Sequence, residues 1–184
     1  MPQLRVFQHF EFPDELKWQV VSFMRIEWPF IFTGANRFLT ELCPPELHPV
    51  HFAIVEGNVL LSYGATLRLE QPHAGEVYRL YGLGNVFTFP PYRREGFGRQ
   101  VVDAATHYIL ASAADVGALF CGARLAPYYR VSGWEAMEGA TTRIGTPDGY
   151  ETHNVLRMML FVSEKGKRGR QAFMHTPFYI ESPW

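Results

Sequence analysis

The first group of residues that is well suited to chemistry lies in the stretch 90–100, where the spacing is Arg93-x-x-Gly96-x-Gly98. A strand-like apolar run precedes the stretch, and a helical pattern from about Phe97 to Leu110 follows it. Glycines let the main chain turn several N–H groups toward one ligand, and the start of a helix adds unpaired N–H groups and the positive end of its dipole. We therefore predict a site for an anion such as a phosphate or pyrophosphate. On this motif alone, an ordinary strand-to-helix turn is the alternative.

A second motif follows one predicted strand later, at 126–134, and reads Ala-Pro-Tyr-Tyr-Arg-Val-Ser-Gly-Trp. Together and in this order, the two motifs resemble those of the GNAT N-acetyltransferases, Arg/Gln-x-x-Gly-x-Gly/Ala and Ala-x-x-Phe-Tyr-x-x-x-Gly-Phe. The resemblance covers roughly residues 50–162 in the order of the elements. It implies an α/β fold in a single domain, residues 1–184. The central sheet is expected to be mixed, mostly antiparallel and splayed at the cofactor cleft, with helices on both faces.

The resemblance also implies a co-substrate, acetyl-coenzyme A, and no metal. Main-chain groups of the strand before the first motif would pair with the pantetheine amides, and the loop would hold the pyrophosphate. The implied strand residues are Val86, Phe87 and Thr88. The implied loop residues are Arg93, Arg94, Glu95, Gly96, Phe97, Gly98 and Arg99.

The chemistry implied by the family is direct transfer of the acetyl group to a primary amine of a small molecule. Tyr129 matches the tyrosine that protonates the leaving thiolate in the family. With an ordinary pKa near ~10, a tyrosine hydroxyl is protonated at neutral pH and able to donate. A purely structural role for Tyr129 in its short helix remains open, and Tyr128 is the alternative if that helix is rotated.

The group that deprotonates the amine is the least defined part of the prediction. Related enzymes place Glu or His nine or eleven residues before the position of Arg93, where this chain has Gly84 and Gly82. Glycines inside a strand predict a bulge or the close approach of a ligand. Glu76 is retained as a weak candidate for the base. The other candidates are His73, Glu27 and a carboxylate at Trp184.

Two further functions stay open. One is a GNAT-fold domain that binds acyl-coenzyme A, or regulates through it, without catalysis, since no base is evident. The other is a resistance enzyme like the aminoglycoside 2′-N-acetyltransferases. The second half resembles these loosely in Gly117-Ala118-Leu119, Gly122-Ala123-Arg124, Gly145-Thr146-Pro147 and Trp184. The missing acids count against a polycationic acceptor. The aromatic residues of 28–38 are expected to flank a bulkier or less charged amine, or else to pack on the sheet.

Periodicity and chain-breaking residues predict the elements that position these motifs. We expect strands at about 4–10, 51–56, 59–69, 76–89, 116–121, 134–144 and 155–162. We expect helices at about 13–27, 97–110 and 126–131, with a short one near 36–42. Turns are predicted at 56–58 and 71–75, and the basic run 165–170 is predicted to be a solvated loop.

The composition is that of a folded, nearly neutral protein. Hydrophobic residues make up 47% of the 184 residues, charged residues 19% and aromatic residues 15%, and the net charge is −1. These values argue against disorder and give no support for nucleic-acid binding. The two cysteines suggest neither a disulfide framework nor a metal site, and no signal peptide or membrane span is evident. We expect a cytoplasmic protein without nucleic-acid or membrane partners, in which a homodimer is possible.

Overall fold

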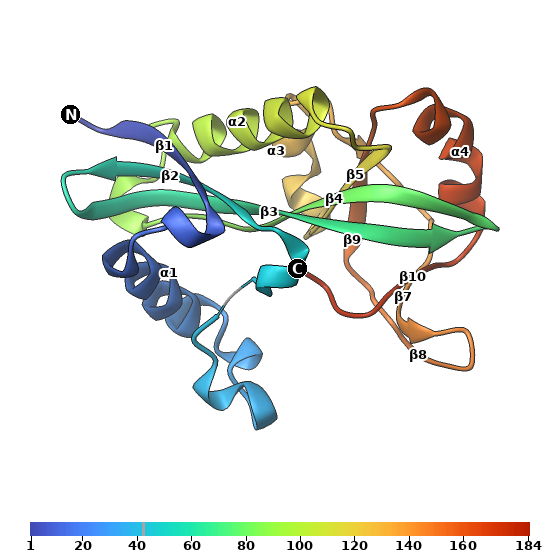
Figure 1. Cartoon of the computed structure of the whole chain (residues 1–184), viewed down its shortest axis with the longest axis horizontal. Coiled ribbons are helices and arrows are strands. Elements are labelled where there is room, and N and C mark those ends of the chain that lie inside the picture. The colour runs from blue at the N-terminus through green and yellow to red at the C-terminus, as the bar shows by residue number, and fades with distance from the viewer. Residues whose placement is uncertain (42) are drawn as a thin grey trace. The chain divides into compact units, whose positions relative to one another are not determined.

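The computed structural model describes residues 1–41 and 43–184. Its strands form a seven-stranded sheet, in the order β1-β2-β3-β4-β5-β9-β6, and a three-stranded sheet, in the order β10-β7-β8 (Figure 1). The strands are β1 Gln3–Gln8, β2 Val50–Glu56, β3 Val59–His73, β4 Glu76–Thr88, β5 Val116–Cys121, β6 Glu135–Ala136, β7 Thr142–Thr146, β8 Gly149–Thr152, β9 Leu156–Phe161 and β10 Phe178–Ile180. The α-helices are α1 Asp14–Glu27, α2 Phe97–Ala111, α3 Ala126–Arg130 and α4 Glu164–His175.

The sheet is mixed, as predicted. β4 and β5 pair in parallel, whereas β1 with β2, β2 with β3, β5 with β9, and β6 with β9 are antiparallel. The predicted α/β fold class is therefore confirmed. Among the described residues, no helix combines the length and the apolar composition that a membrane span requires.

The chain packs as two compact units, residues 1–67 with 85–104 and residues 68–84 with 105–184. β3, β4 and α2 contribute to both units because the boundaries fall within them. The single domain expected for residues 1–184 stays a prediction.

The first unit is organised around one apolar side of α1. Pro13 precedes this helix, and Asp14 and Glu15 in its first turn favour the positive end of the helix dipole. Val20 is fully buried, and the ring of Phe23 stacks on that of Phe87 with 4.4 Å between centroids. The predicted helix at 13–27 is therefore confirmed, and its buried stripe holds it against the sheet.

The second unit has its own core, built where β4, β5, β9 and β10 meet α4. The core residues are Tyr78, Leu80, Val116, Ala118, Met137, Met159, Phe173, Phe178 and Ile180. α4 reaches this core through two glycines. A Cβ on Gly166 would lie 2.9 Å from the main-chain carbon of Asp115, and one on Gly169 would lie 2.9 Å from the ring of Tyr78. Only glycine allows the helix to approach so closely.

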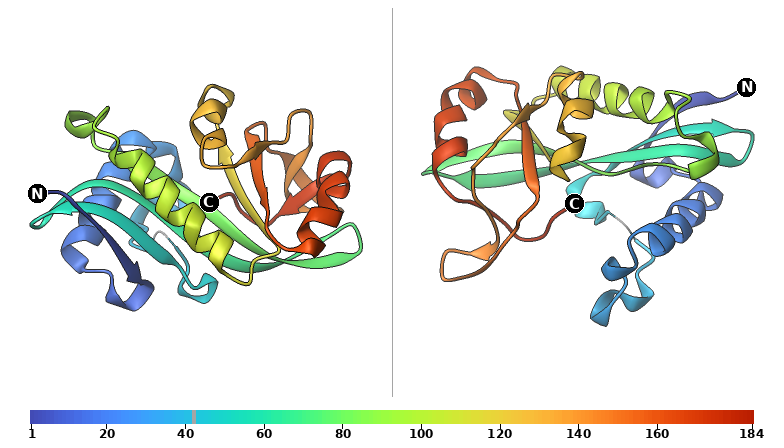
Figure 2. Two further views of the ribbon diagram at one scale, coloured as in Figure 1. Left: turned by 90° about the horizontal axis from the view of Figure 1, so that it is seen from above. Right: turned by 180° about the vertical axis from the view of Figure 1, so that it is seen from behind.

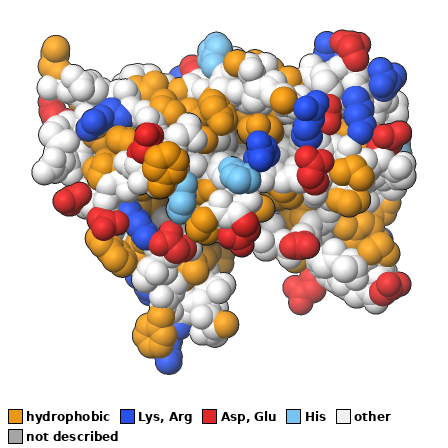
Figure 3. Space-filling model, in the orientation of Figure 1, with side chains coloured by type: hydrophobic (Ala, Val, Ile, Leu, Met, Phe, Trp, Pro, Cys, Tyr) orange, Lys and Arg blue, Asp and Glu red, His pale blue; other side chains and the backbone are white. Residues whose placement is uncertain are grey.

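The prediction of a solvated loop at 165–170 was wrong, because the run lies inside α4. Ser163 caps the helix by accepting a hydrogen bond from the Gly166 N–H at 3.1 Å. The basic side chains are largely paired, and Figure 3 shows Lys and Arg alternating with Asp and Glu over the part of the molecule where Figure 1 draws α4. The ion pairs are Lys165–Glu76, Lys167–Glu164 and Arg170–Glu135.

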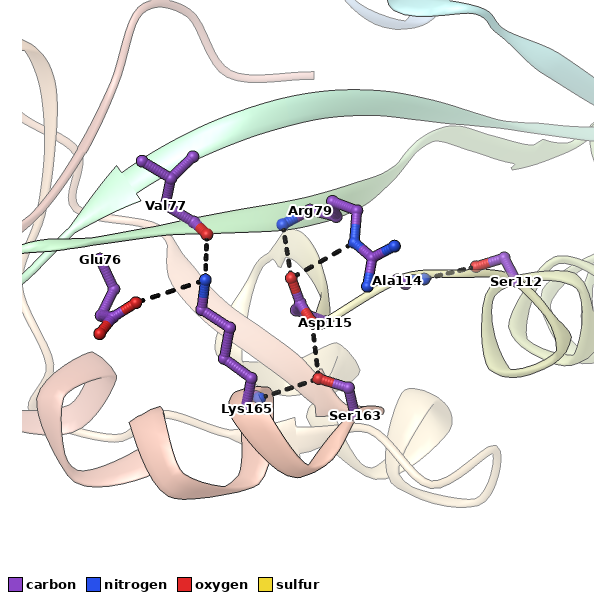
Figure 4. Close-up of polar contacts among 9 residues, drawn as sticks. Glu76, Val77, Arg79, Ser112, Ala114, Asp115, Ser163 and Lys165 are labelled. Atoms are coloured by element: carbon purple, nitrogen blue, oxygen red, sulfur yellow. Dashed lines mark hydrogen bonds and ion pairs between the residues drawn. The ribbon is translucent and has the colours of Figure 1, made fainter.

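Asp115 ties three segments of the second unit together (Figure 4). One carboxylate oxygen accepts the main-chain N–H of Arg79 at 2.9 Å, and the other accepts the hydroxyl of Ser163 at 2.7 Å. The side chain is 6% exposed. Burial alone would raise the pKa of Asp115, but the hydrogen bonds from Ser163 and Arg79 outweigh it and lower that pKa. The carboxylate therefore stabilises the folded state.

We expect Asp115→Asn to lower the free energy of unfolding by about 1.5–3 kcal/mol at pH 7, the usual worth of hydrogen bonds to a charged group. Because the folded-state pKa of Asp115 lies below the ordinary value of 3.8, the contribution is complete above that pH and is lost as the pH falls further. Urea unfolding at pH 7 and pH 3 measures both effects. Asp148→Asn, in an exposed turn, is the control. Equal stability of the two variants at pH 7 would refute the stabilising role of the Asp115 carboxylate.

Three other predictions differ from the structure. The turn expected at 71–75 is only Ala74–Gly75, and β3 runs through Pro72. In the described part of the chain, the pairing of β2 with β3 ends at Thr66, so Pro72 lies beyond it and breaks no bond of that ladder. The strand expected at 134–144 is divided between β6 and β7, which belong to different sheets. The short helix near 36–42 is a 3-10 helix at Gly34–Phe38, and Leu42 lies outside the described residues.

Candidate active site

The parallel pair β4–β5 separates before either strand ends. Its register ends where Gly82 lies opposite Ala118, although β4 continues to Thr88 and β5 to Cys121. In the described part of the chain, the later residues of the two strands do not pair with each other. Main-chain groups there are available to an extended ligand that adds to the strand, as peptides do at sheet edges.

The loop after β4, in the first unit, has the main-chain conformation of an anion nest. Arg94 has φ +75° and Gly96 has φ +79°, on either side of Glu95. Such reversals turn successive N–H groups to one side. A Cβ on Gly96 would meet no atom within 4 Å, and α2 begins at the next residue, Phe97. The N-terminal turn of α2 therefore follows the nest directly, and these residues fit a pyrophosphate group.

The two arginines at the ends of the loop are held by neighbouring groups. Arg93 donates from Nε to the carbonyl of Thr88 at 3.0 Å, and its Nη2 lies 3.7 Å from a carboxylate oxygen of Glu27. Arg99 donates from Nε to Asp103 at 3.1 Å. Their charges are therefore partly balanced within the protein. Anion binding in this loop would depend mainly on main-chain N–H groups.

Val86, Phe87 and Thr88 form the end of β4, in the same unit as the loop. The ring of Phe87 is buried against Phe23, so Phe87 can offer a ligand only its main chain. Its carbonyl already accepts a hydrogen bond from the hydroxyl of Ser62 at 2.8 Å.

Tyr129 lies in α3, in the second unit, and is 7% exposed. Its ring packs edge-on against Tyr128, with 5.1 Å between centroids. In the described part of the chain, its hydroxyl has no hydrogen-bond partner. Burial, followed by the electrostatic influence of Cys121 and Tyr128, raises the pKa of Tyr129 well above its ordinary value. The hydroxyl therefore stays protonated at physiological pH and is free to donate.

The close approach predicted at the strand glycines is made by the chain itself. A Cβ on Gly82 would lie 2.5 Å from the indole Nε1 of Trp184, and one on Gly84 would lie 2.7 Å from the main-chain carbon of the same residue. The indole Nε1 donates to the carbonyl of Ala118 at 3.3 Å. Figure 2 shows the segment after β10 running back to the long central strands. Trp184 therefore fills the position at which the resemblance to the family implied an acid or a histidine.

Glu76, the retained candidate for the base, lies elsewhere in the second unit. It is the first residue of β4, and its carboxylate is 3.4 Å from the ammonium of Lys165. At about 3.3 Å per residue, it lies roughly 20 Å along the strand from Gly82. The structure does not bring Glu76 to the point where β4 and β5 separate.

The other candidates for the base are placed differently. His73 is buried in the core of the second unit, where its ring stacks on Phe173 with 4.3 Å between centroids. Glu27 lies near Arg93 in the first unit. Among these candidates, only Trp184 has its main chain against a strand glycine at the separation point.

Sequence reasoning missed two residues that surround Trp184. The ring of Phe120 lies 5.2 Å from the indole of Trp184 and 5.0 Å from the imidazole of His153. Side chains alternate along a strand, so Phe120 and its neighbour Cys121 lie on opposite faces of β5. The face on which Phe120 lies could therefore have been predicted from the sequence. His153 lies in the loop between β8 and β9, and no sequence signal connects it with β5.

The first unit also contains a cavity of about 470 Å³, and none of the predicted site residues lines it. α1, β3 and the turn before Arg93 form its walls, with Trp18, Phe23, Leu60 and Tyr92 among the lining residues. The aromatic residues expected to flank an acceptor include Phe30 and Phe38, which are exposed by 71% and 75%. These two rings are not packed on the sheet.

Comparison with protein-family models and with curated protein sequences gives no match. Solved structures do match. A probable N-acyltransferase from Enterococcus faecalis V583 has a TM-score of 0.57 and 16% identity over 76% of this chain, which spans 33% of that protein. An acyl-CoA N-acyltransferase from Pseudomonas aeruginosa has a TM-score of 0.57 and 18% identity over 86% of this chain and 99% of its own. An aminoglycoside 6′-N-acetyltransferase complexed with coenzyme A has a TM-score of 0.58 and 11% identity over 86% and 97%.

The fold of this chain is therefore that of the GNAT-type acyl-CoA N-acyltransferases, which confirms the resemblance read from the two motifs. Identities of 11–18% establish the fold alone. The acceptor, the acyl group and the site residues must be argued from the chain's own chemistry.

Proposed function

We propose that the protein is an N-acetyltransferase that moves the acetyl group of acetyl-coenzyme A directly to a primary amine of a small molecule. The separation of β4 from β5 after Gly82 and Ala118 carries the proposal, because it frees strand groups for a pantetheine arm. The nest at Arg94–Gly96 supports it, as does the hydroxyl of Tyr129, for which the described residues provide no hydrogen-bond partner. Coenzyme A in the aminoglycoside 6′-N-acetyltransferase of like fold supports the choice of donor.

In the proposed reaction, the neutral amine nitrogen attacks the thioester carbonyl. A C–N bond forms, the C–S bond breaks, and coenzyme A leaves as a thiolate. Tyr129 donates a hydrogen bond, and finally a proton, to the thiolate sulfur, and the resulting tyrosinate takes up a proton again from water. The proton lost by the amine leaves through water, or through a group near Gly84 other than Glu76. No acyl-enzyme is required.

The raised pKa of Tyr129 is compatible with this role. A hydroxyl with a pKa above that of a free thiol donates its proton unfavourably in water. Burial also disfavours a thiolate, however, and it raises the pKa of the neighbouring Cys121 thiol in the same part of the second unit. A thiolate formed beside Tyr129 would therefore be more basic than in water, which reduces the mismatch.

Release of free thiol tests the proposal. Purified protein, acetyl-coenzyme A and a panel of primary amines are incubated with a thiol-reactive chromogenic disulfide, and release that depends on the amine is expected for at least one member. The panel includes 2-phenylethylamine, ethylamine, spermidine and kanamycin. If coenzyme A binds in calorimetry but no amine accelerates thiol release, the protein is a binding domain without catalysis. The absence of a side-chain base at Gly82 and Gly84 keeps that second candidate in view.

A further inference from the structure

Gly82 and Gly84 present a bare strand face at the point where β4 and β5 separate, and Trp184 covers it. A Cβ at either glycine would lie closer to Trp184 than non-bonded atoms can approach. The three residues therefore pack together, and the indole fits against the strand because the two glycines have no side chains. The face that the two glycines leave bare is covered by a ring from a segment about 100 residues away in sequence.

The indole is held in place by few contacts. Its Nε1 donates to the carbonyl of Ala118 at 3.3 Å, a long hydrogen bond, and its ring packs beside Phe120. The three preceding residues, 181–183, are exposed, whereas Trp184 itself is half-buried. The ring and the main chain of Trp184 therefore anchor this segment to the strands, and removing the ring should leave the rest of the second unit folded.

The surroundings of the indole are aromatic. The ring of Phe120 is tilted by 59° to that of Trp184, and His153 meets Phe120 edge-on at 85°. All three residues are half-buried, so each keeps part of its surface accessible. Burial lowers the pKa of His153, which leaves its imidazole uncharged at neutral pH. In the described part of the chain, neither the ring contacts of these three residues nor the hydrogen bond of the indole involves a carboxylate side chain.

Such a corner discriminates among amines by their shape and charge. Aromatic rings favour a flat apolar group through offset or edge-on packing, and they bury its surface. A polycation gains less from this corner, because the contacts of these rings in the described part of the chain include no carboxylate side chain to pair with each additional ammonium. An acceptor that places a flat group on the indole would direct its amine along the strand face, toward the separation point.

We infer that Trp184 is a specificity-determining residue, which forms one wall of the acceptor subsite and selects amines that carry an aryl group. This inference depends on the proposed acetyl transfer. Phe120 forms the adjoining wall. Gly82 and Gly84 affect the choice of amine only through Trp184, because their lack of a side chain leaves room for the indole.

The ratio of kcat/KM for 2-phenylethylamine to that for ethylamine tests the inference. We expect Trp184→Ala to lower kcat/KM for 2-phenylethylamine by about tenfold or more, mainly through KM, and to change that for ethylamine by less than about twofold. Trp184→Phe should recover most of the loss. Gly82→Ala, which displaces the indole, should reproduce Trp184→Ala. Gly122→Ala, where a Cβ meets nothing within 4 Å, should behave as wild type.

An unchanged ratio in Trp184→Ala would overturn the inference, and so would a wild-type preference for spermidine or kanamycin over 2-phenylethylamine. Both results leave acetyl transfer intact. Failure of the proposed transfer, with the wall intact, is detected by calorimetry. Binding of the amine is measured with coenzyme A present, where no turnover occurs. If wild type binds 2-phenylethylamine and Trp184→Ala does not, yet no amine is acetylated, the wall is supported and the proposed transfer fails. If neither binds it and neither acetylates it, the inference fails.

Discussion

Tyr129→Phe is expected to lower kcat by about 10²- to 10⁴-fold, the usual contribution of a positioned general acid, while coenzyme A affinity stays unchanged. The substitution removes only a hydroxyl that has no hydrogen-bond partner in the described part of the chain, so the fold should not be disturbed. Steady-state kinetics with the best amine of the panel, together with calorimetry for coenzyme A, measures the two quantities separately.

The pH profile gives a second measurement on Tyr129. An acid must be protonated to act, and the pKa of Tyr129 is raised. The activity of the enzyme should therefore decline only at a pH above the ordinary tyrosine pKa near ~10. Below that pH, kcat/KM should rise as the amine becomes neutral. Tyr128→Phe is the matched control, because the two rings are neighbours in α3. A loss confined to Tyr128→Phe would transfer the role to Tyr128, and equal turnover in both variants and wild type would exclude a tyrosine acid.

Gly96→Asp is expected to weaken coenzyme A binding by about 10- to 100-fold. The loop can offer a pyrophosphate several main-chain N–H groups, and losing one hydrogen bond to a charged group typically costs about 1.5–3 kcal/mol, at about 1.4 kcal/mol per tenfold change in affinity. A carboxylate at this position would also repel the phosphates. Calorimetric titration of coenzyme A at two salt concentrations measures the loss and its electrostatic part.

Gly139→Asp is a closely matched control for this variant. Gly139 has φ +81°, against +79° at Gly96, and a Cβ at either residue meets nothing within 4 Å. The two substitutions should therefore have the same effect on folding, while only Gly96→Asp affects the ligand. Aspartate is among the residues that tolerate positive φ best, which limits that effect. Equal coenzyme A affinity in the two variants would contradict the assignment of the loop.

Much of the fold was predictable because its signals are local. The strand before Arg93, the glycines of the loop and the apolar period after Phe97 lie within one short stretch, and each depends on neighbouring residues. The same holds for α1, which begins after Pro13 and carries its apolar side at helical spacing. For these elements, local propensity and tertiary packing favour the same structure.

The missed features depend on contacts between distant residues. Gly166 and Gly169 indicate a loop when only their neighbours are considered, but they are the positions where α4 meets Asp115 and Tyr78. Likewise, the glycines in β4 indicated a close approach without naming what approaches. The corner of Phe120, His153 and Trp184 draws on three separate segments, so no pattern along the chain could have revealed it.

The two glycines of α4 also reverse a common rule of protein engineering. In most helices, replacing an interior glycine by alanine stabilises the protein by up to about 1 kcal/mol, because alanine loses less main-chain entropy on folding. At Gly166 the new methyl group would enter the main chain of Asp115, and at Gly169 it would enter the ring of Tyr78. Automated stabilisation of this protein by helix propensity would therefore select, at these two positions, substitutions that clash with the core of its second unit.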